Sequence, residues 1–120
     1  MLFRSAWLHD RLRIKRAGRW LLHEAIRLDG SVASLMDRRA VAAGARASAT
    51  LVHVAGDATG RLGEVRSALA DCPIECAASA WNGMLVVRML APDSASLRHA
   101  ATLALNVLRQ GRPLPRVWMC

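Results

Sequence analysis

The sequence predicts an α+β fold: a β-rich chain with mostly antiparallel pairing and two helices in its C-terminal part. Three observations lead to this class. Apolar and charged residues alternate near the N-terminus, as in a strand with one face in water. Asn82-Gly83 is a strong signal for a tight hairpin, and two later stretches repeat apolar residues with the period of a helix. The resulting order, β-β and then β-α-β-β-α, contains no internal repeat.

Length and composition set the size of the core. With 120 residues, of which 53% are hydrophobic, the chain can bury roughly two-thirds of its unfolded surface in one core. We therefore expect residues 1–120 to form a single domain. No apolar run approaches the ~18 residues of a membrane helix, and the N-terminus lacks the long apolar core of a secretion signal. The expected location is the cytoplasm, without a membrane partner.

The first predicted element is a basic hairpin. Leu12 and Ile14 alternate with charged residues, which indicates a half-exposed strand. Ala17-Gly18 then forms a tight turn, and a longer strand runs over residues 19–28 to a second turn at Asp29-Gly30. The basic residues of this hairpin either face an acidic partner or simply keep its surface solvated. They are Arg11, Arg13, Lys15, Arg16 and Arg19.

The middle of the chain is predicted from shorter signals. Val32–Met36 suggests one short helix, and residues 45–56 are rich in β-branched side chains and predict a strand. Asp57 or Thr59 can cap the next helix. Its apolar face repeats at i, i+3 and i+7 through Leu62, Val65 and Leu69, and Pro73 ends it.

The last third has the clearest signals. Residues 74–80 and 84–91 predict two strands around the Asn82-Gly83 turn. Asp93 follows a proline and caps the final helix, which ends before Gly111 and Pro113. The apolar stripe of this helix comprises Leu97, Ala101, Ala104, Leu105 and Leu108.

The net charge of the chain suggests nucleic-acid binding, but the distribution of the charged residues along the chain does not. The formal net charge is +8, and basic clusters bind phosphate. Residues 1–30 hold seven basic and three acidic side chains, a balance of +4, and the remainder holds ten and six, also +4. With one Phe and no Tyr, the chain lacks interleaved aromatic residues that stack on bases. A small basic nucleic-acid-binding domain therefore stays the alternative and not the first choice.

No motif of an enzyme or of a metal centre is present. The stretch GDATGRLG has neither the spacing nor the Lys-Ser/Thr pair of a Walker loop, so it predicts a loop and a helix cap. The histidines show no metal-hydrolase spacing, and no nucleophile elbow occurs. Cys72 and Cys76 lack the second pair that a zinc site needs, and an odd number of cysteines is a poor disulfide framework. We expect reduced thiols, no tightly bound cofactor and no catalytic residue.

Glu24 is the one residue of the hairpin that breaks the pattern. A regular strand places it among apolar neighbours on one face, and a carboxylate there must be paired, hydrated or protonated. A bulge could rotate it outward, a salt bridge to Arg27 or Arg13 could neutralise it, or it could line an internal polar passage. His23 would lie on the opposite face. The residues expected to share the face of Glu24 are Trp20, Leu22, Ile26 and Leu28.

The chain ends on PLPRVWMC, which is unusually apolar for a terminus. Pro113 and Pro115 hold this tail extended, and Val117 and Trp118 can dock it against the body of the protein or against a partner. Cys120 ends the tail with a soft thiol, for which a structural role is the ordinary interpretation.

Three stretches together resemble the C-terminal half of urease accessory proteins of the UreD/UreH family. They are RIKRAGRWLLHEAIRLDG, SAWNGMLVVRMLAPD and the closing LPRVWMC. Their order and spacing match over nearly all of the chain. The resemblance implies a large β-rich fold with two late helices, of which this chain would be an incomplete portion. It also implies a non-enzymatic scaffold that binds apo-urease and UreF, recruits UreG through UreF, and assists nickel insertion.

The resemblance also implies roles for particular residues. Family members are thought to offer an internal route for nickel, with an acidic residue in the strand that matches residues 19–28, which makes Glu24 a candidate nickel contact together with Cys120. The candidate partner-binding residues are Trp20, Arg27, Arg116 and Trp118. A typical member begins with a long β-rich segment that this chain lacks. The remaining alternative is therefore a truncated remnant without function.

Overall fold

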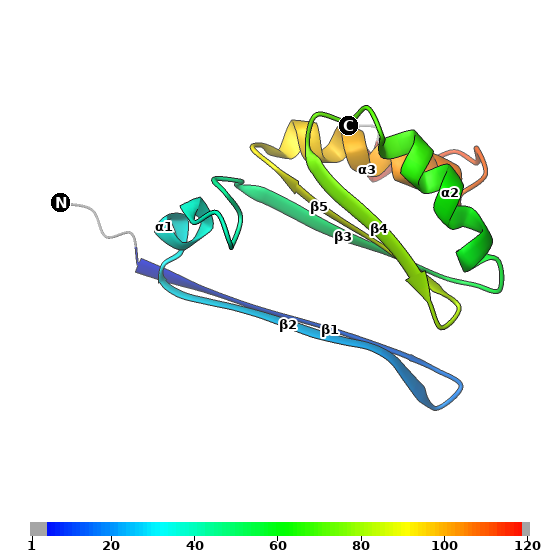
Figure 1. Cartoon of the computed structure of the whole chain (residues 1–120), viewed down its shortest axis with the longest axis horizontal. Coiled ribbons are helices and arrows are strands. Elements are labelled where there is room, and N and C mark those ends of the chain that lie inside the picture. The colour runs from blue at the N-terminus through cyan, green and yellow to red at the C-terminus, as the bar shows by residue number, and fades with distance from the viewer. Residues whose placement is uncertain (1–4, 119–120) are drawn as a thin grey trace. The chain divides into compact units, whose positions relative to one another are not determined.

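The computed structural model describes residues 5–118 and shows an α+β fold with antiparallel sheets, as predicted. The chain divides into two compact units, Met1–Ala45 and Arg46–Cys120. Figure 1 shows a long hairpin in the first unit and a sheet with two helices in the second. The expectation of a single domain over residues 1–120 stays a prediction.

The first unit is a two-stranded hairpin followed by a short helix. β1 (Ser5–Arg16) pairs antiparallel with β2 (Arg19–Ser31). Ala17 and Gly18, with φ of 49° and 79°, form the two-residue turn, since a type I′ turn needs positive φ at both central positions. The predicted turn at residues 29–30 is wrong, because β2 continues to Ser31. The predicted short helix is present as α1 (Val32–Asp37).

A bulge in β2 interrupts the register of the hairpin. Ile14 pairs with Leu22 but Lys15 pairs with Trp20, so Leu21 is the extra residue. A bulge changes the face on which the following side chains lie. Trp20 therefore does not share the face of Leu22, and that part of the predicted arrangement is wrong. The signal was in the sequence, since the consecutive Leu21 and Leu22 break the alternation.

The second unit contains a three-stranded antiparallel sheet in the order β3-β5-β4. Its strands are β3 (Ala47–Val54), β4 (Glu75–Trp81) and β5 (Met84–Ala91). Asn82 and Gly83, with φ of 52° and 71°, make the predicted turn between β4 and β5. The most apolar strand, β5, lies in the centre.

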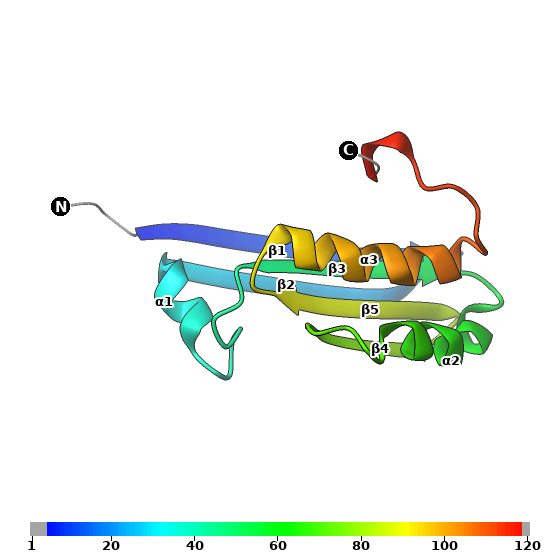
Figure 2. The same ribbon diagram turned by 90° about the horizontal axis from the view of Figure 1, so that it is seen from above.

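Two helices lie side by side over one face of this sheet (Figure 2). They are α2 (Ala58–Leu69) and α3 (Ser94–Leu108), both at the predicted positions. Leu85, Val87 and Met89 of β5 point into the core beneath them. The helices contribute Val65, Leu69 and three alanines of α3 that permit close packing, namely Ala100, Ala101 and Ala104. Among the described residues no helix is both long and apolar enough to span a membrane.

The predicted helix caps differ in how they act. The Asp93 carboxylate accepts a 2.7 Å hydrogen bond from the Ser96 backbone N–H and caps α3. Asp57 occupies the N-cap position of α2 but makes no side-chain cap bond. Its carboxylate instead accepts hydrogen bonds from His53 Nε2 at 3.1 Å and Arg61 Nε at 3.0 Å. These contacts tie the end of β3 to the first turn of α2.

Candidate functional site

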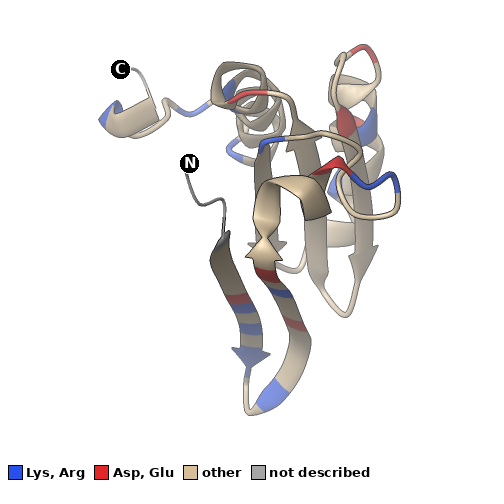
Figure 3. Ribbon diagram, turned by 90° about the vertical axis from the view of Figure 1, so that its left-hand side faces the viewer, with Lys and Arg blue, Asp and Glu red and all other residues tan. Residues whose placement is uncertain are grey.

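The bulged hairpin has a face that carries cations and exposed tryptophans. Odd-numbered residues of β1 and their partners on β2 share this face, and we call it the cationic face. Figure 3 shows bands of basic residues along both strands of the hairpin. The members that carry a positive or aromatic side chain are Trp7, His9, Arg11, Arg13, Lys15, Trp20, His23 and Arg27.

Trp20 lies on the cationic face because of the bulge. The Lys15 Nζ sits 5.2 Å from the centroid of the Trp20 ring, within the range of a cation–π contact. At the other end of the face, the ring of Trp7 lies 5.2 Å from that of His9. Trp7 is 72% exposed and Trp20 is 58% exposed, so both rings are accessible to a partner.

The one carboxylate on this face, Asp29, is already paired. It accepts a 2.6 Å hydrogen bond from Arg27 Nε and lies 2.8 Å from His9 Nε2. The bond from Arg27, and then that from His9, lowers the pKa of the Asp29 carboxyl. Arg27, predicted to bind a partner, thus has a structural role in addition to its exposed position. Because Asp29 is paired in this way, the basic residues of β1 dominate the charge of the cationic face.

Glu24 lies on the opposite, apolar face of the hairpin, as predicted. It pairs with Leu12 across the strands, and Leu22 and Ile26 precede and follow it on the same side of β2. His23, Arg13 and Arg27 lie on the cationic face, so the predicted separation of Glu24 from His23 is present. The bulge lies on the N-terminal side of Glu24 and does not turn it outward. Its role as a nickel contact stays a prediction.

The tail that follows α3 packs on the second unit, to which it belongs. Arg116–Trp118 forms a 3-10 turn, and Trp118 packs against the hydrophobic core of the second unit. Val117 is 73% exposed, so only Trp118 packs against the protein itself, and contact of either side chain with a partner stays a prediction. Arg109 Nη2 donates a 2.9 Å hydrogen bond to the Pro113 carbonyl and fixes the start of the tail. Cys120 lies outside the described residues.

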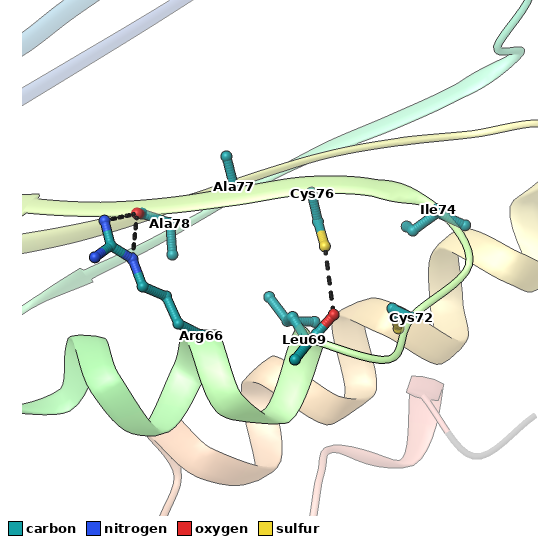
Figure 4. A pocket seen from close by; sticks show the side chains of 8 residues that line it. Arg66, Leu69, Cys72, Ile74, Cys76, Ala77 and Ala78 are labelled. Atoms are coloured by element: carbon teal, nitrogen blue, oxygen red, sulfur yellow. Dashed lines mark hydrogen bonds between the residues drawn. The ribbon is translucent and has the colours of Figure 1, made fainter.

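A cavity of about 390 Å³ opens beside β4, and Cys72 and Cys76 are among the residues that line it (Figure 4). Cys72 and Cys76 are free thiols, half-buried and packed against the core. Burial, and secondarily the Cys72 thiol, raises the pKa of the Cys76 thiol. A raised pKa makes a cysteine less reactive. These thiols belong to the core, as the sequence indicated.

Arg66 lines the other end of this cavity (Figure 4), a position that the sequence did not reveal. Its Nε and Nη2 donate to the Ala78 carbonyl of β4 at 3.2 and 2.9 Å. β4 is an edge strand of its sheet, and edge carbonyls need a partner or a cover. Arg66 therefore satisfies one carbonyl of this edge, that of Ala78. Within residues 5–118 no group of three or more His, Cys, Asp or Glu side chains is placed to hold a metal ion.

A family model described as UreD urease accessory protein matches residues 2–119. The chain belongs to the UreD family of urease accessory proteins. Its relatives include proteins named urease accessory protein UreD from Methylobacterium sp. (strain 4-46), 52% identical over 96% of this chain, and from Azorhizobium caulinodans, 47% identical over 96%. A third, from Rhizobium leguminosarum bv. viciae, is 41% identical over 98% of this chain.

The chain spans only part of these UreD proteins. It covers 42% of the Methylobacterium and Azorhizobium proteins and 40% of the Rhizobium protein. The resemblance found in the sequence is thus confirmed at the level of the family. The long hairpin, the two late helices and the docked Trp118 belong to the matched part of the UreD fold.

Proposed function

We propose that this chain acts in urease maturation as a non-enzymatic assembly factor of the cytoplasm. The observation that carries the proposal is the family match over residues 2–119. Relatives that match almost the whole chain are named urease accessory proteins. The exposed cationic face supports a role in protein contact, since a surface with Arg and Trp side chains is typical of binding sites.

The expected partners are UreF, UreG through UreF, and apo-urease. In this proposal the cationic face and the tail contribute contacts through Trp20, Arg27, Arg116 and Trp118. Arg27 and Trp20 are exposed. Trp118 is only partly buried on the core, so in this proposal it fixes the tail that presents Arg116 and leaves part of its ring to a partner.

Nickel is the cargo of this process, and Glu24 is the proposed contact within residues 5–118. Glu24 shares its face of the hairpin with Leu12, Leu22 and Ile26, at the position where the resemblance implies an acidic residue on the route of nickel. Replacing Glu24 with Gln removes the charge and keeps the shape. We expect slower nickel loading of urease with Glu24→Gln and unchanged loading with Glu75→Gln, a matched change on the exposed part of β4.

The partner proposal is tested by co-purification. The tagged 120-residue chain is expressed with UreF and apo-urease from the same cell, and captured proteins are quantified at low and high salt. A full-length UreD relative serves as the positive control, because the chain spans only about 42% of such proteins. Salt-resistant capture by a folded chain supports the proposal. A chain that is folded by circular dichroism but captures neither protein, while the relative captures both, contradicts it.

One observation favours a second candidate, a nucleic-acid-binding hairpin. The cationic face carries Trp7 and Trp20, which are accessible for stacking on bases. For such a hairpin, the logarithm of the binding constant falls steeply and linearly with the logarithm of the salt concentration. Titration with single-stranded DNA at several salt concentrations tests it.

A further inference from the structure

We propose that Cys72 and Cys76, with Met89 as a third sulfur ligand, bind monovalent copper, a soft metal ion, in the cavity beside β4. All three sulfur atoms belong to residues 72–89 of the second unit. The site is distinct from the proposed nickel contact at Glu24, which lies on the hairpin of the first unit. It therefore goes beyond the proposed function and does not depend on it.

One backbone carbonyl brings the two cysteines together. At the C-terminal end of α2, the Leu69 carbonyl accepts a 3.1 Å hydrogen bond from the Cys72 backbone N–H. The Cys76 thiol donates to the same oxygen, with its Sγ at 3.9 Å, and Figure 4 shows the Cys76 side chain pointing to it. After burial, the Cys72 thiol is the second cause that raises the pKa of Cys76. The two thiols are therefore neighbours across the turn from α2 to β4.

Met89 supplies a third sulfur atom from the neighbouring strand. It pairs directly with Cys76 across β4 and β5, and the side chains of such a pair lie on the same face with Cβ atoms about 5 Å apart. Met89 is 2% exposed and belongs to the hydrophobic core, against which Cys76 also packs. Because a methionine side chain is flexible and its sulfur polarizable, this thioether can reach an ion that Cys76 holds.

The lining of the cavity selects a soft ion. Among the described residues that line it, none carries a carboxylate, an imidazole or an amide side chain. Thiolate and thioether ligands favour Cu(I), which two or three sulfur atoms can hold, whereas oxygen ligands suit Mg²⁺ and Ca²⁺. A structural zinc ion takes four ligands, and residues 5–118 provide no group of even three His, Cys, Asp or Glu side chains. Cu(I) is therefore the ion that fits these ligands.

Ligation exchanges protons for the ion and involves no redox step. Each thiol releases its proton to solvent as its sulfur binds Cu(I), so two thiolates and one cation leave a single net negative charge. The guanidinium of Arg66 lines the same cavity and offsets that charge. When the Cys76 thiol loses its proton, the Leu69 carbonyl keeps its hydrogen bond from the Cys72 backbone N–H.

The test titrates the full chain, reduced and free of oxygen, with Cu(I) held by the coloured chelator bathocuproine disulfonate. The loss of colour gives the Kd. We expect binding that is at least about a hundredfold weaker for Cys72→Ser and for Cys76→Ser, because the loss of a group that only orients a ligand already costs about 10–100-fold. Met89→Leu should weaken binding about tenfold, since a thioether is a neutral, weak acceptor.

Two matched controls remove sulfur from other positions. Cys120→Ser removes a thiol from the end of the chain. Met84→Leu removes a buried methionine of β5 that pairs with Trp81 and not with Cys76. Both variants should bind Cu(I) as the unsubstituted chain does.

A second measurement needs no substitution and stays decisive if a variant fails to fold. The unsubstituted chain is treated with N-ethylmaleimide in the presence and absence of Cu(I), and the modified cysteines are mapped by mass spectrometry. We expect Cu(I) to protect Cys72 and Cys76 and to leave the modification of Cys120 unchanged.

Any of four results would overturn the proposal. Equal weakening by Cys120→Ser would mean that Cu(I) binds thiols without selection, and unchanged binding by Met89→Leu would contradict the three-sulfur site. Displacement of Cu(I) by equimolar Ni²⁺ or Zn²⁺ would contradict the selection of a soft ion. Equal modification of Cys72 and Cys76 with and without Cu(I) would place the ion elsewhere. None of these readouts involves UreF or urease, so they separate this proposal from the proposed function.

Discussion

Replacing Trp118 with Ala tests whether the tail is held by the core or reserved for a partner. Trp118 is half-buried and packs against the core of the second unit. Truncating a buried Trp or Phe to Ala costs about 3–5 kcal/mol. Because only part of the ring is covered, we expect a loss of about half that, ~2 kcal/mol of unfolding free energy.

The assay is urea unfolding followed by far-UV circular dichroism, which does not depend on the tryptophan removed. Val117→Ala is the matched control, since Val117 lies in the same 3-10 turn and is 73% exposed. We expect the control to stay within about 0.5 kcal/mol of the unsubstituted chain. Capture of UreF is measured on both variants under conditions where they remain folded.

The outcome separates two roles of the ring. A destabilised Trp118→Ala chain means that the indole anchors the tail to its own core, so any loss of capture is indirect. Unchanged stability would refute the packing argument. If capture were lost at the same time, the ring would be a partner contact and not an anchor.

Three further predictions concern the fold. Leu85→Ala in the centre of β5, where the side chain is fully buried, should cost about 2–5 kcal/mol in urea unfolding, and a loss below the lower figure would mean that the core relaxes around the cavity. Asp93→Ala should lower the unfolding midpoint near neutral pH, because the Ser96 backbone N–H then loses its cap. The bond to that N–H lowers the pKa of the Asp93 carboxyl below its ordinary value. Its contribution is therefore present above that value and is lost as pH falls through the folded pKa. Asp93→Asn, which cannot titrate, should lack this acid dependence. Gly18→Val should speed hydrogen exchange in β1 and β2, because a β-branched residue at φ of 79° is strained by roughly 1–2 kcal/mol, and unchanged exchange would argue against the turn.

Local signals in the sequence sufficed for most elements. Asn82-Gly83 and Ala17-Gly18 identified both hairpin turns because few residues adopt the positive φ that such turns require. Asp93 identified the start of α3 because a short acidic side chain can accept from the free N–H groups of a first helical turn. The motifs of the family were also sufficient to assign the chain to the UreD proteins, as the family match confirms.

The face on which each side chain lies required the structure. The alternation of β2 correctly placed Glu24 on the apolar face, but a bulge at Leu21 moved Trp20 to the cationic face. One extra residue reverses every side chain beyond it, since the period of a strand is two. The roles of Arg66 at the β4 edge and Trp118 on the core depend on residues distant in sequence. Local patterns thus predicted the two hairpin turns and the helices of this protein, and the resemblance of its motifs indicated the family. Tertiary packing alone decided which side chains meet, because those contacts join segments that no local pattern links.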